Sequence, residues 1–155
     1  MTYTEREAHE RFLADVHVGV LSVADATGTI ATPIWYRYEP GGTVEVITST
    51  TSRKGRAIRA AGRFGMTAQV ETVPYRYVSV EGPVVETRSV EFGRDLVPMA
   101  VRYLGRDAGE QYAALWRDAG IDQTAVFAVR PERWFAADLT DELAAFAPQP
   151  SKGQP

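Results

Sequence analysis

Residues 46–63 read VITSTTSRKGRAIRAAGR and join the end of a predicted strand to a short amphipathic helix. The β-branched residues before the hydroxyl cluster favour a strand over residues 43–49. Ser52 suits the N-cap of the helix, because its side-chain oxygen can accept a hydrogen bond from a free N–H of the first turn. Gly62 suits the helix end, where a left-handed backbone is common. The stretch therefore predicts a strand that runs into the N-terminus of a helix.

Positive charge and hydroxyl groups gather at this helix N-terminus. Residues 48–51 read TSTT, and Arg53 and Lys54 follow directly after the cap. Free N–H groups, hydroxyls and cations are the groups that bind a phosphate or another anion. No Asp or Glu lies between Glu45 and Glu71, so no acidic residue of the stretch opposes this charge. A solvated helix start and a polar strand end are the simpler interpretations of the same residues.

The composition of the whole chain limits the classes of protein to consider. Its 155 residues carry a net charge of −3 and are 45% hydrophobic, which is typical of one globular domain. The acidic balance disfavours nucleic acid as a partner. With no cysteine and only His9 and His17, we expect neither a disulfide nor a thiolate or histidine-rich metal site. We find neither a signal-peptide pattern nor an apolar run of membrane-spanning length, so we expect a soluble cytoplasmic protein with no membrane partner.

The chain before this stretch predicts a helix and two strands. Thr4 is expected to cap a helix over residues 4–15, with acidic residues in its first turn. Residues 16–24 and 30–38 are rich in β-branched and aromatic residues and predict strands. Pro33 has no N–H for a sheet hydrogen bond, so it indicates an edge strand, a bulge or a backbone that faces a ligand.

The chain after this stretch predicts two more strands, two helices and a last strand, which can resume at residues 134–135. The helix pair is expected to bury its large apolar residues, Tyr103, Tyr112, Leu115 and Trp116. In chain order, the strands cover residues 63–71 and 75–86 with a bend at Gly82-Pro83, the helices cover 92–104 and 107–119, and the last strand covers 124–129.

Six short strands, mostly linked by hairpins, favour an all-β core with peripheral helices. This is an α+β arrangement in which antiparallel strands form a barrel or a sandwich. No linker interrupts the chain, so residues 1–147 are predicted to form one domain. Residues 148–155, PQPSKGQP, have the composition of a disordered C-terminal tail.

Four short motifs follow one another along the chain: TPIWY at 32–36, ITSTTSRKG at 47–55, YVSVEG at 77–82 and RYLG at 102–105. In this order and spacing they resemble the pyridoxamine 5′-phosphate oxidase-like split β-barrel superfamily, which includes flavin and deazaflavin oxidoreductases. The second motif is similar to the phosphate-binding segment of that superfamily, and the first to the strand beside the isoalloxazine ring. The fourth resembles the branch that contains enzymes of the deazaflavin coenzyme F420. The resemblance covers most of residues 16–138.

The resemblance implies an antiparallel split β-barrel that forms a homodimer, with a flavin-type cofactor in a cleft between the subunits. The cofactor is coenzyme F420 or FMN. We favour the deazaflavin, because its anionic tail suits the cations Arg53, Arg56 and Arg59. The cofactor-binding residues implied by the resemblance are Ile47, Thr48, Ser49, Ser52, Arg53 and Lys54 near the phosphate, Pro33, Ile34 and Trp35 along the ring, and Arg56 and Tyr77 beside them.

The chain also departs from the oxidase that names the superfamily. That oxidase has an Arg where this chain has Thr32, a Gln where it has Tyr77, and an Arg-x-His segment near its end. No histidine follows His17 here, so we do not expect oxidation of vitamin B6. The implied function is transfer of a hydride between the cofactor and a small conjugated organic substrate, with no dedicated catalytic side chain in view. The alternative is a protein that binds flavin, deazaflavin or haem without turnover.

Overall fold

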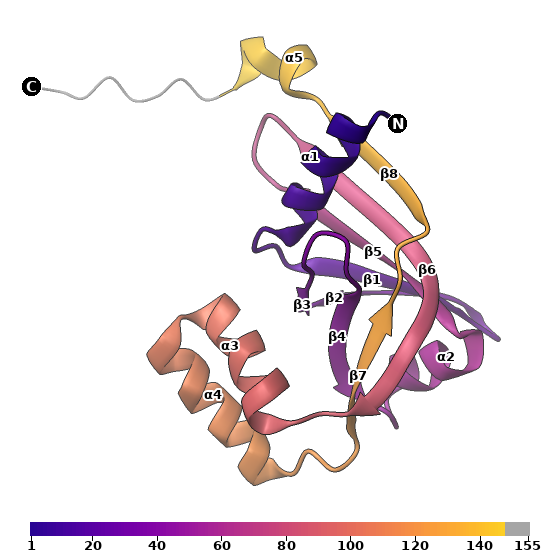
Figure 1. Cartoon of the computed structure of the whole chain (residues 1–155), viewed down its shortest axis with the longest axis vertical. Coiled ribbons are helices and arrows are strands. Elements are labelled where there is room, and N and C mark those ends of the chain that lie inside the picture. Colours follow the sequence, from indigo (N-terminus) through magenta and orange to yellow (C-terminus); the bar gives the residue numbers. More distant parts are fainter. Residues whose placement is uncertain (148–155) are drawn as a thin grey trace, which may run out of the picture.

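The computed structural model describes residues 1–147, in which eight strands form one curled sheet and helices lie outside it (Figure 1). The strands are β1 (Gly19–Asp25), β2 (Gly28–Ile34), β3 (Tyr36–Arg37), β4 (Val44–Ser49), β5 (Arg63–Val70), β6 (Arg76–Ser89), β7 (Thr124–Val129) and β8 (Arg133–Asp138). The helices are α1 (Tyr3–Ala14), α2 (Arg53–Ala61), α3 (Val97–Leu104), α4 (Arg106–Ala119) and α5 (Thr140–Leu143). All strand pairs are antiparallel, which confirms the predicted antiparallel core with peripheral helices.

The strands are hydrogen-bonded in the order β2-β1-β5-β6-β7-β4-β3, with β8 paired to β6 outside this path. β2 and β3 are at opposite ends of the order, yet only Trp35 separates them in the chain. The chain therefore passes directly from one edge of the curled sheet to the other, and the prediction of one strand over 30–38 was wrong. We call this crossing, Ile34 to Tyr36, the seam. Pro33 lies in β2, an edge strand, which is one of the positions its missing N–H allows.

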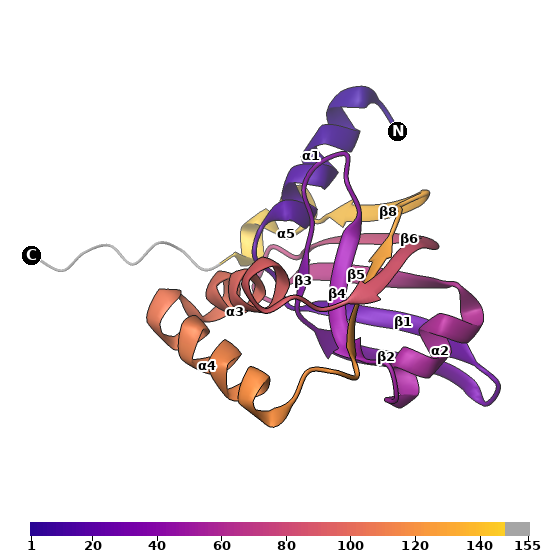
Figure 2. The ribbon, with the colours of Figure 1, turned by 60° about the horizontal axis from the view of Figure 1, so that its bottom comes forward.

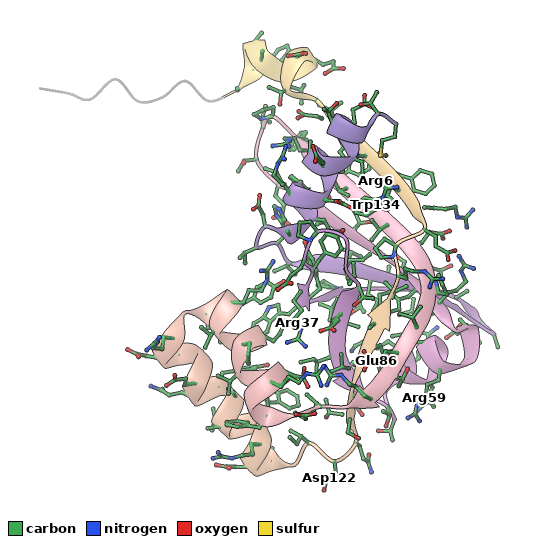
Figure 3. The ribbon with its side chains drawn as sticks, in the orientation of Figure 1. Arg6, Arg37, Arg59, Glu86, Asp122 and Trp134 are labelled. Atoms are coloured by element: carbon green, nitrogen blue, oxygen red, sulfur yellow. The ribbon has the colours of Figure 1, made fainter. Side chains whose placement is uncertain are left out.

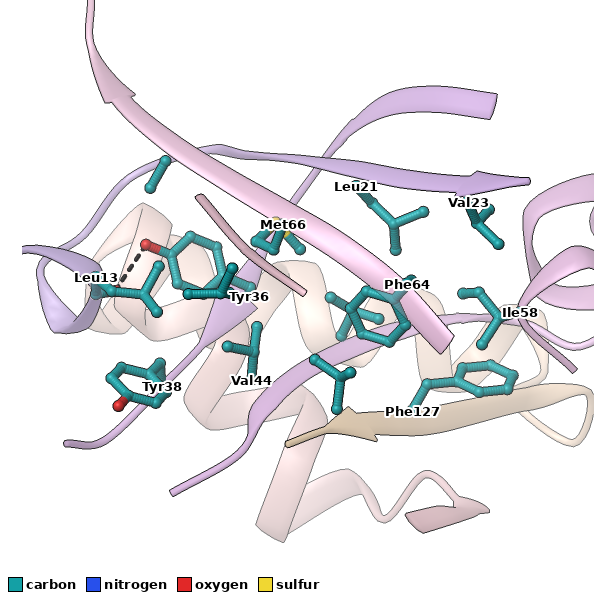
Figure 4. Packing of buried hydrophobic residues seen from close by; sticks show 14 of the residues in the cluster. Leu13, Leu21, Val23, Tyr36, Tyr38, Val44, Ile58, Phe64, Met66 and Phe127 are labelled. Atoms are coloured by element: carbon teal, nitrogen blue, oxygen red, sulfur yellow. Dashed lines mark hydrogen bonds between the residues drawn. The ribbon is translucent and has the colours of Figure 1, made fainter. Parts of the chain in front are cut away.

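The main core lies inside the curl of the sheet, where alternate residues of the strands are buried (Figure 4). In β1, for example, Leu21 and Val23 are buried, and in β4 Val46 is buried, as the two-residue period of a strand requires. Tyr36 is fully buried among them, and its hydroxyl donates to the carbonyl oxygen of Leu13 at 2.7 Å. This bond ties α1 to the sheet.

The N-cap of α1 is Thr2 rather than the predicted Thr4. The Thr2 hydroxyl accepts from the Glu5 amide at 3.2 Å, and the Glu5 carboxylate accepts from the Thr2 amide at 2.6 Å. This reciprocal pair is a capping box. Thr4 and Glu7 have the same spacing, so the spacing alone did not distinguish the two starting points. For a helix that ends at Ala14, a cap at Thr2 rather than Thr4 lengthens the helix and adds backbone hydrogen bonds.

β6 connects the two parts of the sheet. Its first part pairs with β5 and β8, and its last part pairs with β7. A bend was predicted at Gly82-Pro83, and the break in register occurs just after it, between Val84 and Glu86. Gly82 is required by packing, because a Cβ there would lie 1.9 Å from the carbonyl oxygen of Arg130. β8 confirms that an extended strand resumes after the break that follows β7.

α3 and α4 form a helical hairpin at one side of the sheet, opposite the side where α2 lies (Figure 2). A π-helical turn over Phe92–Leu96 leads into α3. The two helices approach closely at Gly109, where a Cβ would lie 2.6 Å from the Cα atom of Val101. The prediction that Leu115 and Trp116 are buried was wrong, since they are 70% and 48% exposed. Gly109 and Ala113 are the buried residues of α4, because small side chains permit this close approach.

A buried carboxylate fastens the start of this hairpin to the sheet. Asp95, in the π-helical turn, accepts from Arg88 of β6 at 2.6 and 2.7 Å, from Arg37 of β3 at 2.6 Å and from the Glu91 amide at 2.9 Å. Figure 3 shows Arg37 where the sheet faces the hairpin. Burial alone would raise the pKa of Asp95, but the bonds from Arg88, Glu91 and Arg37 outweigh burial and lower this pKa to about 2. Asp95 therefore stays ionised.

The described chain ends with α5 and a 3₁₀ turn over Ala144–Phe146. Residues 148–155, for which a disordered tail was predicted, lie outside the described residues. The single domain over residues 1–147 stays a prediction. None of the helices found in residues 1–147 has the length and apolar character needed to cross a bilayer.

Candidate functional site

The end of β4 and the start of α2 meet at the predicted anion site. Ser52 caps the helix: its Oγ accepts from the Gly55 amide at 3.1 Å and donates to the Ser49 carbonyl oxygen at 2.7 Å. Gly62 ends the helix with a left-handed backbone, at φ 64°. The predicted cap and the predicted helix end are both confirmed.

Gly55 allows α2 to lie directly against the end of β4, because a Cβ there would lie 2.0 Å from the Ser49 carbonyl oxygen. We expect Gly55→Ala to displace the first helical turn and to lower the free energy of unfolding by about 1–3 kcal/mol. Chemical denaturation measures this loss. Gly93→Ala is the matched control, because a Cβ at Gly93 has no neighbour within 4 Å. Equal stability of the two variants would contradict the close approach.

Polar groups surround the first turn of α2. The amides of Arg53 and Lys54 have no acceptor within residues 1–147, as expected for the first residues of a helix. Thr48 and Ser49 place their hydroxyls at the end of β4, and Thr48 is only 7% exposed. Lys54 is half-buried and forms no ion pair in the described part of the chain. Together they form a site with donors and one unneutralised cation.

These polar groups line one end of a pocket of about 460 Å³. That volume lies within the usual range for small-molecule sites. The pocket continues away from α2 between the seam and the α3–α4 hairpin, where its walls are mainly apolar. Pro33, Ile34 and Trp35 form the wall on the seam side, and Leu96, Met99 and Ala100 form part of the opposite wall.

Neighbouring aromatic side chains run from the seam to the hairpin. The rings of Trp35 and Tyr103 stack with centroids 4.9 Å apart and planes 5° apart. The ring centroids of Tyr112 and Trp35 are 5.2 Å apart, and those of Trp116 and Tyr112 are 6.2 Å apart; both pairs are tilted by 50°. Trp35, Tyr112 and Trp116 all line the pocket. Planar side chains in this arrangement provide flat apolar surfaces that a planar ligand can contact.

Most of the predicted cofactor-binding residues lie together in this pocket. They come from the seam, from β4 and from the start of α2, which are separate in the chain. Those that line the pocket are Pro33, Ile34, Trp35, Ile47, Thr48, Ser49, Ser52 and Lys54.

Arg53 does not line the pocket, because it pairs with Asp25 at the end of β1. Its Nε donates to Asp25 Oδ2 at 2.9 Å, and its Nη2 donates to Thr27 Oγ1 at 3.1 Å. Hydrogen bonds from Thr27, and then from Arg53, lower the pKa of Asp25. An acidic residue from outside the stretch therefore neutralises one of its cations. Asp25 is distant in the chain, so the sequence around Arg53 did not reveal it.

Arg56 and Tyr77 also lie away from the pocket in the single chain. Arg56 is exposed and donates to the carbonyl oxygen of Thr51. Tyr77, on β6 opposite Gln69 of β5, borders a different pocket. A role for Arg56 and Tyr77 in cofactor binding stays a prediction.

The sequence did not indicate that the α3–α4 hairpin closes this pocket. Its amphipathic pattern predicted two helices with an apolar side, but that pattern does not say which surface the side covers. The pocket residues that were not predicted are Val18, Leu96, Met99, Ala100, Tyr112, Trp116, Ile121 and Thr124.

Solved structures of other proteins have a similar fold. An F420 reductase superposes with a TM-score of 0.64 at 20% identity, over 81% of this chain and 94% of that one. A conserved hypothetical protein from Mycobacterium tuberculosis superposes with a TM-score of 0.69 at 20% identity, over 99% of this chain and 93% of that one. A candidate pyridoxamine 5′-phosphate oxidase from Listeria innocua superposes with a TM-score of 0.58 at 13% identity, over 85% of this chain and 97% of that one. No protein-family model and no curated protein sequence matches the chain.

These similarities establish the class of fold. The chain shares the fold of these structures, and this agrees with the antiparallel split β-barrel that the resemblance of the four sequence motifs predicted. Identities of 13–20% establish the fold alone, so the case for a function depends on the pocket.

Proposed function

We propose that this protein is an oxidoreductase that binds a flavin-type cofactor, coenzyme F420 or FMN. It transfers a hydride between the cofactor and a small conjugated organic substrate in the cytoplasm. The observation that carries this proposal is one pocket with donors for a phosphate at one end and aromatic walls at the other. An F420 reductase of the same fold adds support.

The polar end of the pocket fits a phosphate monoester. The free amides at the start of α2 and the Lys54 ammonium group are donors at a helix N-terminus, where an anion is also favoured by the helix dipole. Thr48 and Ser49 add hydroxyls beside them. The Ser52 hydroxyl already donates to the Ser49 carbonyl oxygen, so Ser52 contributes by capping the helix and orienting its amides.

The aromatic end of the pocket fits a planar ring system. Pro33 and Trp35 supply one wall, and Met99 and Tyr112 supply another. When bound, a flavin or deazaflavin ring supplies the hydride chemistry. These side chains would hold the ring and exclude water from it. No charged side chain of the described residues lines this end, so a neutral conjugated substrate fits beside the ring.

The direct test is titration of the purified protein with FMN and with coenzyme F420, followed by tryptophan fluorescence. Trp35 and Trp116 line the pocket, so a ring bound between them quenches their emission. We expect saturable quenching by at least one cofactor and weakening of that binding by excess inorganic phosphate. Absence of binding by both cofactors would contradict the proposal.

Between the two cofactors we favour coenzyme F420. Its anionic tail extends beyond the phosphate, and Arg56 and Arg59 are exposed on α2 without an acidic partner in residues 1–147. Arg53 is close to them but is paired with Asp25. Tight binding of FMN with none of the deazaflavin would overturn this preference.

A homodimer is part of this proposal. Tyr77 of β6 and Phe135 of β8 are 41% and 56% exposed, and the pairing of β6 with β8 places them on the same face of the sheet. A second copy seated on this face buries both rings and carries Tyr77 toward the partner's pocket. Light scattering is expected to give twice the chain mass of 17.1 kDa.

Mixing two variants tests whether the dimer completes the site. Lys54→Ala removes the cation of the pocket, and Tyr77→Ala removes the residue expected from the partner. If each site combines the two subunits, a mixed dimer has one site that lacks both residues and one intact site. We expect each variant to bind the cofactor weakly and the refolded mixture to regain tight sites. No recovery in a mixture that forms dimers would mean that Tyr77 does not reach the partner's site.

The second candidate function is binding of the cofactor, or of haem, without turnover. The observation that favours it is the lack of a charged side chain other than Lys54 among the described residues that line the pocket, which leaves no dedicated acid or base. Reoxidation of the bound reduced cofactor distinguishes the two functions. If the protein is an oxidoreductase, we expect a quinone or an enone to reoxidise the bound reduced cofactor faster than buffer alone does.

A further inference from the structure

One side chain from α3 holds the backbone at the seam. Trp35 lies between β2 and β3 and belongs to neither strand. The Tyr36 amide donates to the hydroxyl oxygen of Tyr103 at 3.0 Å. That hydroxyl lies 2.6 Å from the carbonyl oxygen of His17 and 2.9 Å from that of Tyr36, and it donates its hydrogen to one of them. Burial raises the pKa of Tyr103, so the hydroxyl keeps this hydrogen.

The same side chain also supports the walls of the pocket. The Tyr103 ring stacks on Trp35, with centroids 4.9 Å apart and nearly parallel planes. Trp35 and Val18 line the pocket, and they adjoin Tyr36 and His17, whose backbone groups the Tyr103 hydroxyl contacts. Tyr103 is not among the residues that line the pocket itself. It therefore reaches two parts of the pocket wall from behind.

We propose that Tyr103 is a positioning residue for the ring end of the pocket. Its hydroxyl closes the seam, in that it holds the backbone of Tyr36 beside the carbonyl oxygen of His17. Its ring sets the plane of the Trp35 ring. Without the hydroxyl, the Tyr36 amide has no partner, and the segment that carries Trp35 is free to shift. The identity of the ligand rests on the proposed function, whereas the closure of the seam does not.

Hydrogen exchange at the Tyr36 amide tests the closure of the seam directly. We expect this amide to exchange about tenfold or more faster in Tyr103→Phe than in the wild type, because its acceptor is removed. Tyr36→Phe is the matched control. It also deletes a buried tyrosine hydroxyl, the one bonded to Leu13, but it leaves the acceptor of this amide in place. Unchanged protection in a folded Tyr103→Phe protein overturns the proposal.

Two partial ligands allow the ring end and the phosphate end of the pocket to be tested separately. Riboflavin carries the ring without a phosphate, and inorganic phosphate carries the anion without a ring. We expect Tyr103→Phe to weaken the binding of riboflavin and of FMN by a similar factor, on the order of tenfold, and to leave phosphate binding unchanged. Tyr36→Phe measures the effect of general destabilisation and is expected to leave both affinities unchanged.

The pattern of affinities decides between positioning and a purely structural role. Equal weakening of riboflavin and phosphate by Tyr103→Phe means that the variant damages the whole site, which overturns a specific role at the ring end. Unchanged riboflavin affinity together with fast exchange at Tyr36 also overturns it. A wild-type protein that binds no flavin, deazaflavin or phosphate overturns the proposed function and the positioning role together. The exchange of the Tyr36 amide then still decides whether the hydroxyl closes the seam.

Discussion

Asp95→Asn is expected to lower the free energy of unfolding by about 3–5 kcal/mol, the usual loss when one member of a buried ion pair is removed. Asp95 is fully buried and accepts three bonds from Arg88 and Arg37. The variant preserves the shape of the side chain but leaves two largely buried guanidinium groups without this counter-charge. These arginines belong to β6 and β3, so the α3–α4 hairpin also loses its attachment to the sheet. Chemical denaturation at neutral pH measures the loss.

Glu91→Gln is the control for Asp95→Asn, because Glu91 immediately precedes the same π-helical turn. Its carboxylate forms an exposed ion pair with Arg94 at 3.6 Å. Such surface pairs contribute about 0–1 kcal/mol. A loss for Asp95→Asn that is no larger than the loss for Glu91→Gln would show that the buried network does not stabilise the fold.

The pH dependence of stability gives a second measurement on Asp95. Its pKa in the folded protein is about 2, below the value of about 3.9 expected in the unfolded chain. The stability that its ionised form contributes is therefore complete above about pH 4 and is lost as the pH falls from about 4 to about 2. At about 1.4 kcal/mol per pKa unit, this lowering corresponds to about 2–3 kcal/mol. Asp25 and Asp138 also have lowered pKa values, so the difference between wild type and Asp95→Asn isolates Asp95.

The polar end of the site was predictable because its signals are local. The cap at Ser52, the helix of nine residues and the left-handed turn at Gly62 depend on neighbours within a few positions in the chain. Hydroxyls and a lysine next to such a cap are visible in the sequence. The partner of Arg53 was not predictable in this way, because Asp25 reaches it from the end of another strand.

The seam was not predictable from local composition. Residues 30–38 have the β-branched and aromatic character of one continuous strand, yet the sheet divides at Trp35. The hydroxyl that pairs with the Tyr36 amide belongs to Tyr103, 67 positions later in the chain. Propensity describes how a segment fits a pleated surface, whereas the point where a curled sheet closes depends on contacts between distant segments. For the same reason, the wall that α3 and α4 give the pocket became visible only in the folded chain.

Lys54→Ala is expected to weaken cofactor binding by about 1.5–3 kcal/mol, which is roughly 10- to 150-fold in the dissociation constant. The variant deletes a hydrogen bond to a charged group from the cation that lines the polar end of the pocket. The helix is expected to survive, because Ala is a strong helix former. Fluorescence titration with FMN and coenzyme F420 measures the loss. Riboflavin, which has no phosphate, is expected to bind the variant and the wild type equally.

Two further cations of α2 show whether the loss is specific to Lys54. Arg59→Ala removes the same charge from an exposed position on this helix (Figure 3), so it reports the long-range effect of net charge, which salt screens. Arg53→Ala removes a cation that Asp25 already neutralises, and we expect a smaller loss than for Lys54→Ala. Equal losses of cofactor affinity for all three variants would mean that the positive charge of α2 as a whole, and not a specific site at Lys54, binds the anion. A large loss for Arg53→Ala with none for Lys54→Ala would move the phosphate to the Asp25 side of the helix N-terminus, outside the pocket.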